Sequence, residues 1–139
     1  MRRRAFLLAF FPLAVSFAAD PKPGTIRGKL LQSPGKAPAI ETADHRVISL
    51  AGDEPTQRVL NDPRLAGFDL EAKGRFTAAD QFVVDPIHTK AMFVHKDGHV
   101  KVITYWCDVC SIRTYAPGPC WCCQKETLLD LRDPDQDDQ

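Results

Sequence analysis

Phe68-Asp69-Leu70-Glu71-Ala72-Lys73-Gly74-Arg75-Phe76 is the stretch that decides the fold class of this 139-residue chain. Apolar or small side chains alternate strictly with charged ones along it, which is the period of a β-strand that buries one face. A helix would instead repeat its apolar positions every three to four residues. The stretch therefore predicts a long, half-buried strand, which needs partner strands beside it.

Shorter runs on both sides of this strand supply candidate partners. They cover residues 25–31, 39–42, 46–50 and 82–87, the last of them interrupted at Pro86. One helix is expected between the third and fourth strands, at residues 54–65. Pro55 suits its first turn, and Asp62-Pro63 interrupts it.

A β-hairpin follows this group of strands. Residues 91–95 and 99–105 flank a turn that contains Asp97-Gly98, a favoured hairpin dipeptide because glycine adopts positive φ at low cost. The second strand of the hairpin runs directly into Cys107, so we expect the first cysteine at a strand end. Residues 124–131 predict a closing helical turn whose leucines pack on the domain.

The strand order, with one helix between the third and fourth strands, resembles the oligonucleotide/oligosaccharide-binding (OB) barrel. The resemblance covers about residues 24–90 and includes Gly28, Gly52 and Gly74 near strand ends. It implies a small antiparallel barrel and nothing about a ligand, because this fold carries many functions. We expect a mainly β single domain over residues 25–131. It would comprise an OB-like barrel at 25–90, and an appended β-hairpin with a C-terminal cysteine-rich knuckle at 91–131.

The N-terminal residues 1–19 have the composition of a secretory signal peptide. Arg2, Arg3 and Arg4 precede an apolar run, and cleavage is expected near Ala18 or Ala19. The run is shorter than the roughly 20 residues that span a bilayer, so we expect no membrane anchor after cleavage. The protein is therefore predicted to be periplasmic or extracellular.

The export route has two candidates. The general secretion route is favoured. However, Arg3-Arg4-Ala5-Phe6-Leu7 resembles the twin-arginine signal, which implies export of a folded protein, often with its cofactor already bound.

The remaining end segments are polar. Residues 20–24 are expected to be a linker, and the acidic residues 132–139 a disordered tail. The whole chain has 18 basic and 18 acidic side chains, and removal of the three leader arginines leaves a net charge of −3. A mildly acidic protein without a basic stripe is not expected to bind nucleic acid.

All five cysteines lie in the last third of the chain. They read Cys107-Asp108-Val109-Cys110, then nine residues, then Cys120-Trp121-Cys122-Cys123. Tetrahedral Zn²⁺ prefers four soft ligands, and the C-x2-C pair supplies two of them. The Pro-Gly-Pro bend before the second group would bring the other two back. We expect Cys107 and Cys110 to form one ligand pair and Cys120 and Cys122 the other, with Cys123 as the spare thiol or as a substitute for Cys122.

Three other interpretations of the cysteines stay open. Disulfides could staple an exported domain, although five thiols is an odd number and adjacent Cys122 and Cys123 rarely bridge each other. Compact thiolate pairs also suit Cu(I), and four thiolates suit an iron–sulfur cluster. Finally, residues 106–110 resemble the Trp-Cys-x-x-Cys site of thioredoxin-like proteins. That resemblance implies an extracytoplasmic thiol–disulfide or electron-transfer function through Cys107 and Cys110.

Residues 113–124 resemble the tail of uncharacterised secreted bacterial proteins, a resemblance that implies no activity. The chain has no metalloprotease motif, phosphate-binding glycine loop or nucleophile elbow. The sequence therefore predicts an exported zinc-binding protein with a binding or structural role rather than a catalytic one. It leaves open a protein partner.

Overall fold

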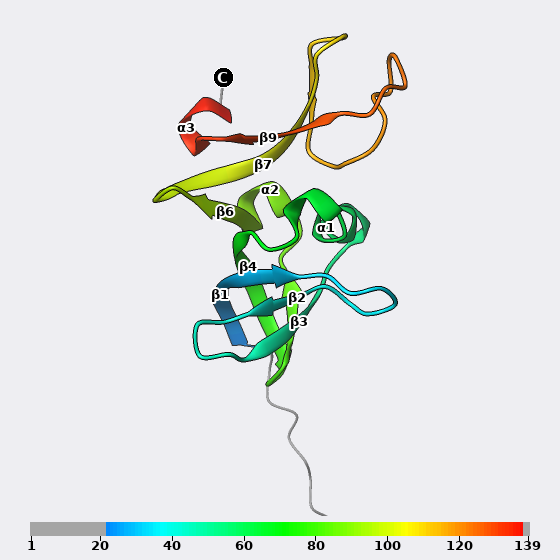
Figure 1. Ribbon diagram of the computed structural model, residues 1–139. Coiled ribbons are helices and arrows are strands. Elements are labelled where there is room, and N and C mark those ends of the chain that lie inside the picture. The colour runs from blue at the N-terminus through cyan, green and yellow to red at the C-terminus, as the bar shows by residue number, and fades with distance from the viewer. Residues whose placement is uncertain (1–21, 138–139) are drawn as a thin grey trace, which may run out of the picture.

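The computed structural model describes residues 22–137, and the side chains of residues 22–135. The predicted signal peptide and the first two residues of the expected linker lie outside the described residues. Figure 1 shows two parts stacked on each other: a barrel that contains β1 to β5, and a sheet formed around β7 and β9.

Five strands close the barrel. They are β1 (Lys22–Leu31), β2 (Ala39–Glu41), β3 (Val47–Ala51), β4 (Asp69–Ala78) and β5 (Gln81–Val84). β1 pairs with β2, β2 with β3, β3 with β5 in parallel, β5 with β4, and β4 again with β1. The mainly β fold class is confirmed, and the closed five-stranded barrel is consistent with the OB-like architecture.

β4 is a half-buried strand, as its alternating sequence predicts, and it pairs with β1, β5 and β6. Leu70, Ala72 and Gly74 are buried, while the charged residues that alternate with them are exposed or half-buried. Its first half, Asp69–Ala72, pairs with β6, and its second half, from Gly74 onward, pairs with β5. The barrel core is formed by the inward-facing residues of the barrel strands. They include Leu30 of β1, Ile40 of β2, Ile48 and Leu50 of β3, and Phe82 of β5.

The predicted helix lies between β3 and β4. α1 spans Glu54–Leu60, and a 3₁₀ turn at Pro63–Leu65 follows it. The Asp53 side chain caps α1 by accepting a hydrogen bond from the Thr56 N–H at 3.0 Å. Val59 and Leu60 are fully buried, so the helix packs against the barrel core.

The predicted hairpin is also present. β6 (Met92–Lys96) and β7 (His99–Cys107) pair with each other, and Asp97 and Gly98 in the turn both have positive φ. β7 further pairs with β8 (Ile112–Thr114) and with β9 (Leu128–Arg132). The short helices α2 (His88–Ala91) and α3 (Pro134–Asp137) precede β6 and follow β9.

Several local predictions were wrong. Residues 22–24, expected in a linker, belong to β1 and pair with residues 74–76 of β4. The helical turn expected at 124–131 is replaced by β9, because β7 offers a free edge and strand pairing satisfies the backbone there. The tail expected to be disordered from residue 132 begins with the last residue of β9 and continues into α3. Ile87, expected in a strand, instead precedes α2 with a φ of 65°.

Barrel closure depends on glycine at position 74. A Cβ at this position would lie 2.0 Å from the Val83 carbonyl oxygen of β5, so Gly74→Ala must push two paired strands apart. We expect Gly74→Ala to lower the free energy of unfolding by about 1–3 kcal/mol in urea denaturation.

Gly24→Ala in β1 is the matched control. Its added Cβ would meet only the Phe76 ring, at 3.7 Å, and the free energy of unfolding should change by less than about 0.5 kcal/mol. Equal stability of the two variants would contradict the role given to Gly74.

Candidate metal centre

Two chain reversals build the cysteine site. Cys107 ends β7 opposite Ile112 of β8, and residues 108–111 form the turn between them. Cys120 follows the bridge between Pro119 and Glu126, and its N–H donates to the Lys125 carbonyl oxygen at 2.7 Å. Each reversal has a second cysteine three residues after the first, at Cys110 and at Cys123. We call residues 107–111 the first knuckle and residues 120–124 the second knuckle.

The two knuckles share one feature of their backbone. The residue after the second cysteine is left-handed in both, with a φ of 53° at Ser111 and 64° at Gln124. In each knuckle the sulfur of the first cysteine accepts a backbone hydrogen bond at 3.4 Å, from Cys110 N–H to Cys107 Sγ and from Cys122 N–H to Cys120 Sγ. These N–H groups orient the two sulfurs and favour their thiolate form.

Four sulfurs converge on one centre. The Sγ atoms of Cys107, Cys110, Cys120 and Cys123 all lie within 4.8 Å of one another, and those of Cys107 and Cys123 are 3.5 Å apart. A tetrahedral Zn²⁺ ion with bonds of about 2.3 Å holds its sulfurs about 3.8 Å apart, so the four need only a small contraction. All five cysteines are free thiols, and the disulfide pairing left open by the sequence is not seen.

Cys122 is not in this group of four, although it was the residue expected to pair with Cys120. Its side chain is exposed, and Cys123 occupies the position that was given to it. The signal was present in the sequence, because Cys120 and Cys123 repeat the C-x2-C spacing of Cys107 and Cys110. The extra thiol between them made the second half look like a different, C-x-C-C pattern.

The thiols differ in acidity. The N–H groups of Cys123 and Cys122 lower the pKa of Cys120 to about 7. At Cys107 the hydrogen bond from the Cys110 N–H acts in the same direction, but burial and the Cys123 thiol outweigh it and the pKa is raised. The pKa of Cys110 is raised by its hydrogen bond with the Cys122 thiol and by burial. Cys120 is therefore the most acidic of these three thiols and the first of them to be ready to bind a cation.

A buried carboxylate ties both knuckles to the barrel. Asp62, which follows α1, accepts a hydrogen bond from the Tyr105 hydroxyl at 2.8 Å and one from Arg64 Nε at 3.0 Å. Tyr105 lies in β7, two residues before the first knuckle. Arg64 also donates through Nη1 to the Thr127 carbonyl oxygen at 2.7 Å, just beyond the second knuckle.

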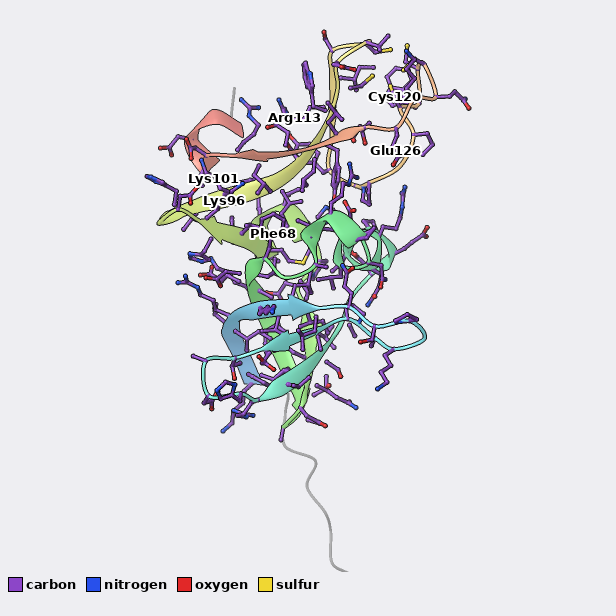
Figure 2. All side chains as sticks on the ribbon, viewed as in Figure 1. Phe68, Lys96, Lys101, Arg113, Cys120 and Glu126 are labelled. Atoms are coloured by element: carbon purple, nitrogen blue, oxygen red, sulfur yellow. The ribbon has the colours of Figure 1, made fainter. Side chains whose placement is uncertain are left out.

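Two further side chains hold the segment between the knuckles. Arg58 of α1 donates through Nη2 to the Pro117 carbonyl oxygen at 2.6 Å. Nε2 of His88 lies 2.6 Å from the Tyr115 carbonyl oxygen, which can only accept, so this nitrogen carries the proton. Figure 2 shows Cys120 at the end of the molecule opposite β1–β3, beyond β7 and β9.

Other side chains near the hairpin have different partners. Nε2 of His95 lies 3.2 Å from a Glu71 carboxylate oxygen rather than near the sulfurs. Arg113 donates to Asp130 at 2.7 Å and lies over the Trp106 ring, so its charge is directed to that carboxylate. Among the residues that the structure describes, the four cysteines are the one group of three or more potential metal ligands.

Comparisons of the chain with family models, curated proteins and solved structures found no match in any of the three. The resemblance of residues 113–124 to secreted bacterial proteins therefore has no support beyond the sequence itself. No helix in residues 22–137 is long and apolar enough to cross a membrane.

The acidity of Cys120 gives a pH-dependent signal. In the reduced, metal-free protein, ultraviolet thiolate absorbance should rise in a first step near pH 7, because the pKa of this thiol is lowered from 9.0 to about 7. Below that pH the thiol is protonated and the step is absent. Cys120→Ser should remove the step, and a step that persists in this variant would contradict the assignment.

The Asp62 contact gives a stability signal. Tyr105→Phe keeps the ring but deletes the donor to a carboxylate that is 4% exposed, so we expect the free energy of unfolding to fall by about 1–3 kcal/mol. Urea denaturation under reducing conditions measures this loss. An unchanged midpoint would show that the hydroxyl does not stabilise the fold.

Proposed function

We propose that this chain is an exported structural metal-binding protein in which Cys107, Cys110, Cys120 and Cys123 hold one Zn²⁺ ion. The observation that carries the proposal is the convergence of these four sulfurs to within 4.8 Å of one another. Each of the two knuckles contributes one buried and one half-buried cysteine. Four protein ligands complete a tetrahedron and leave no open position, which is the arrangement of structural rather than catalytic zinc sites.

The segment that carries the knuckles supports a structural role. Between residues 108 and 126, all of which the structure describes, Cys120 is the one residue whose side chain is buried. Apolar burial therefore contributes little to the ordering of this stretch, whose conformational entropy opposes a fixed structure. A metal bound by both knuckles would supply the missing stabilisation, because its binding free energy is gained only when the ligands are assembled.

Zinc fits the site better than the other metals considered. Cu(I) is satisfied by fewer soft ligands, whereas here four sulfurs converge. An iron–sulfur cluster places several iron and sulfide atoms between its thiolates and needs them farther apart than a single ion does. The compact group of four sulfurs therefore supports a single tetrahedral ion.

The alternative, thiol–disulfide exchange or electron transfer through Cys107 and Cys110, has weaker support. A redox nucleophile is exposed and has a lowered pKa, usually at a helix N-terminus. Cys107 is 2% exposed, ends a strand, and has a raised pKa. Export to the periplasm or the extracellular space is part of the proposal and is supported by the composition of residues 1–19.

Native mass spectrometry combined with elemental analysis tests the proposal on protein purified from the periplasm. We expect one zinc ion per chain. Cys123→Ser should lower the zinc affinity by on the order of a hundredfold, because it removes one of four thiolates. Cys122→Ser is the matched control in the same knuckle and should keep the zinc.

The opposite outcome is also defined. A metal-free mass that is two or four hydrogens below that of the reduced chain would show disulfides and overturn the zinc assignment. Loss of zinc in Cys122→Ser with retention in Cys123→Ser would overturn the ligand set.

A further inference from the structure

A crevice lies beside the hairpin of β6 and β7, at the end of β7 opposite the first knuckle. It has a volume of about 370 Å³ and is lined by Phe68, Lys96, Asp97, Lys101, Leu129 and Leu131. Figure 2 shows Phe68, Lys96 and Lys101 on the hairpin side of the molecule, away from Cys120. The crevice is therefore separate from the cysteine site, and its size is that of a small-molecule pocket.

The floor of the crevice is apolar and fixed in place. Leu129 and Leu131 lie opposite the buried Tyr105 and Ile103 of β7, so they are on the face of β9 that packs against the core. Phe68 directly precedes β4, and its backbone N–H and carbonyl are both hydrogen-bonded. All three floor side chains pack against the core but stay half-buried. They form a preformed apolar surface on which an apolar group is favoured over water.

Two ammonium groups border this apolar floor. Nζ of Lys96 lies 5.9 Å from the centre of the Phe68 ring, and this lysine forms no ion pair among the side chains of residues 22–135. Nζ of Lys101 lies 2.7 Å from a carboxylate oxygen of Asp133. Asp97 is the one acidic side chain of the lining, so two lysines and one aspartate give the lining a net charge of +1.

Asp133 shows which chemical group this border accepts. It follows β9, and the chain itself thus supplies a carboxylate to the lysine of the crevice. The Lys101 ammonium lowers the pKa of Asp133 through its hydrogen bond and its charge, and the charge of His99 acts in the same direction. The Asp133 side chain is 48% exposed. An ion pair with such an exposed partner contributes little to stability, so a carboxylate from outside can replace it at low cost.

We propose that this crevice binds a small carboxylic acid with an apolar body. The body packs on Phe68 and on the two leucines of β9, and the carboxylate takes the place of Asp133 at Lys101, within reach of Lys96. A free acid fits better than the end of a peptide, because the apolar floor offers no partner to peptide amides. Asp133 is then an internal competitor, which lowers the apparent affinity in proportion to its own occupancy of the lysine.

Titration of the full chain with 4-phenylbutyrate, followed in amide ¹H–¹⁵N NMR spectra, tests this proposal. We expect the shifts to concentrate at Phe68, Leu129 and Leu131. The alcohol 4-phenylbutanol keeps the apolar body but carries no charge, and it should bind about tenfold more weakly.

Three variants locate the site. Lys96→Gln should weaken the binding of 4-phenylbutyrate by about fivefold, whereas Asp133→Asn should strengthen it by about threefold because it removes the competing carboxylate. Lys36→Gln is the matched control, since this lysine is exposed in the loop between β1 and β2 and does not line the crevice. It should bind like the wild type. A gain of affinity in Asp133→Asn is a result that damage to the fold does not produce.

Four results would overturn the inference. The first is the absence of binding at about 10 mM 4-phenylbutyrate. The second is equal affinity for the acid and the alcohol, and the third is an unchanged affinity in both Lys96→Gln and Asp133→Asn. The fourth is tighter binding of the peptide acetyl-Gly-Gly-Phe than of the free acid, which would assign the crevice to the terminus of a protein. None of these results bears on the cysteine site at the other end of β7.

Discussion

The ion pair between Asp62 and Arg64 positions both knuckles of the cysteine site. Asp62 is almost fully buried and would be costly without partners, but Arg64 matches its charge and Tyr105 donates to it. Tyr105 belongs to the strand that leads into the first knuckle, and Arg64 reaches the chain just after the second knuckle at Thr127. One carboxylate therefore positions two segments that are distant in sequence. Removal of one partner would leave an incompletely satisfied charge in the interior.

The barrel and the knuckles are stabilised by different means. The barrel has a continuous apolar core that includes Val59 and Leu60 of α1, and burial of this core stabilises the barrel without a metal. The knuckles have almost no apolar core of their own, and their sulfurs are oriented by backbone N–H groups instead. This division explains why the cysteines can lie at one end of the molecule without contributing to the packing of β1–β5.

The barrel strands, α1 and the hairpin could be predicted because their signals are local. Alternation along β4, Pro55 at the start of α1 and Asp97-Gly98 in the turn each specify one conformation within a few residues. β9 could not be predicted in this way, because its pairing with β7 depends on an edge that only the folded sheet provides. The same reason applies to residues 22–24, whose linker-like composition is overridden by pairing with β4.

The cysteine site was predicted as a group, but not in its detail. The existence of two thiol pairs and their convergence follow from the spacing and from the Pro-Gly-Pro bend. The choice between Cys122 and Cys123 does not, because it depends on which sulfur the second knuckle turns inward. The residues that follow Cys110 and Cys123, which are Ser111 and Gln124, both have a left-handed backbone conformation. Neither residue type favours this conformation, so the sequence does not predict it.

The order of the elements along the chain has a consequence for biosynthesis. Every pairing that closes the barrel lies within residues 22–84. The first strand can pair with β2 early, but it meets its second partner only when β4 has been made. All five thiols come after residue 106 and so leave the ribosome after the barrel strands. The barrel strands are therefore available for pairing before any of the thiols, and the candidate metal site is assembled after the barrel.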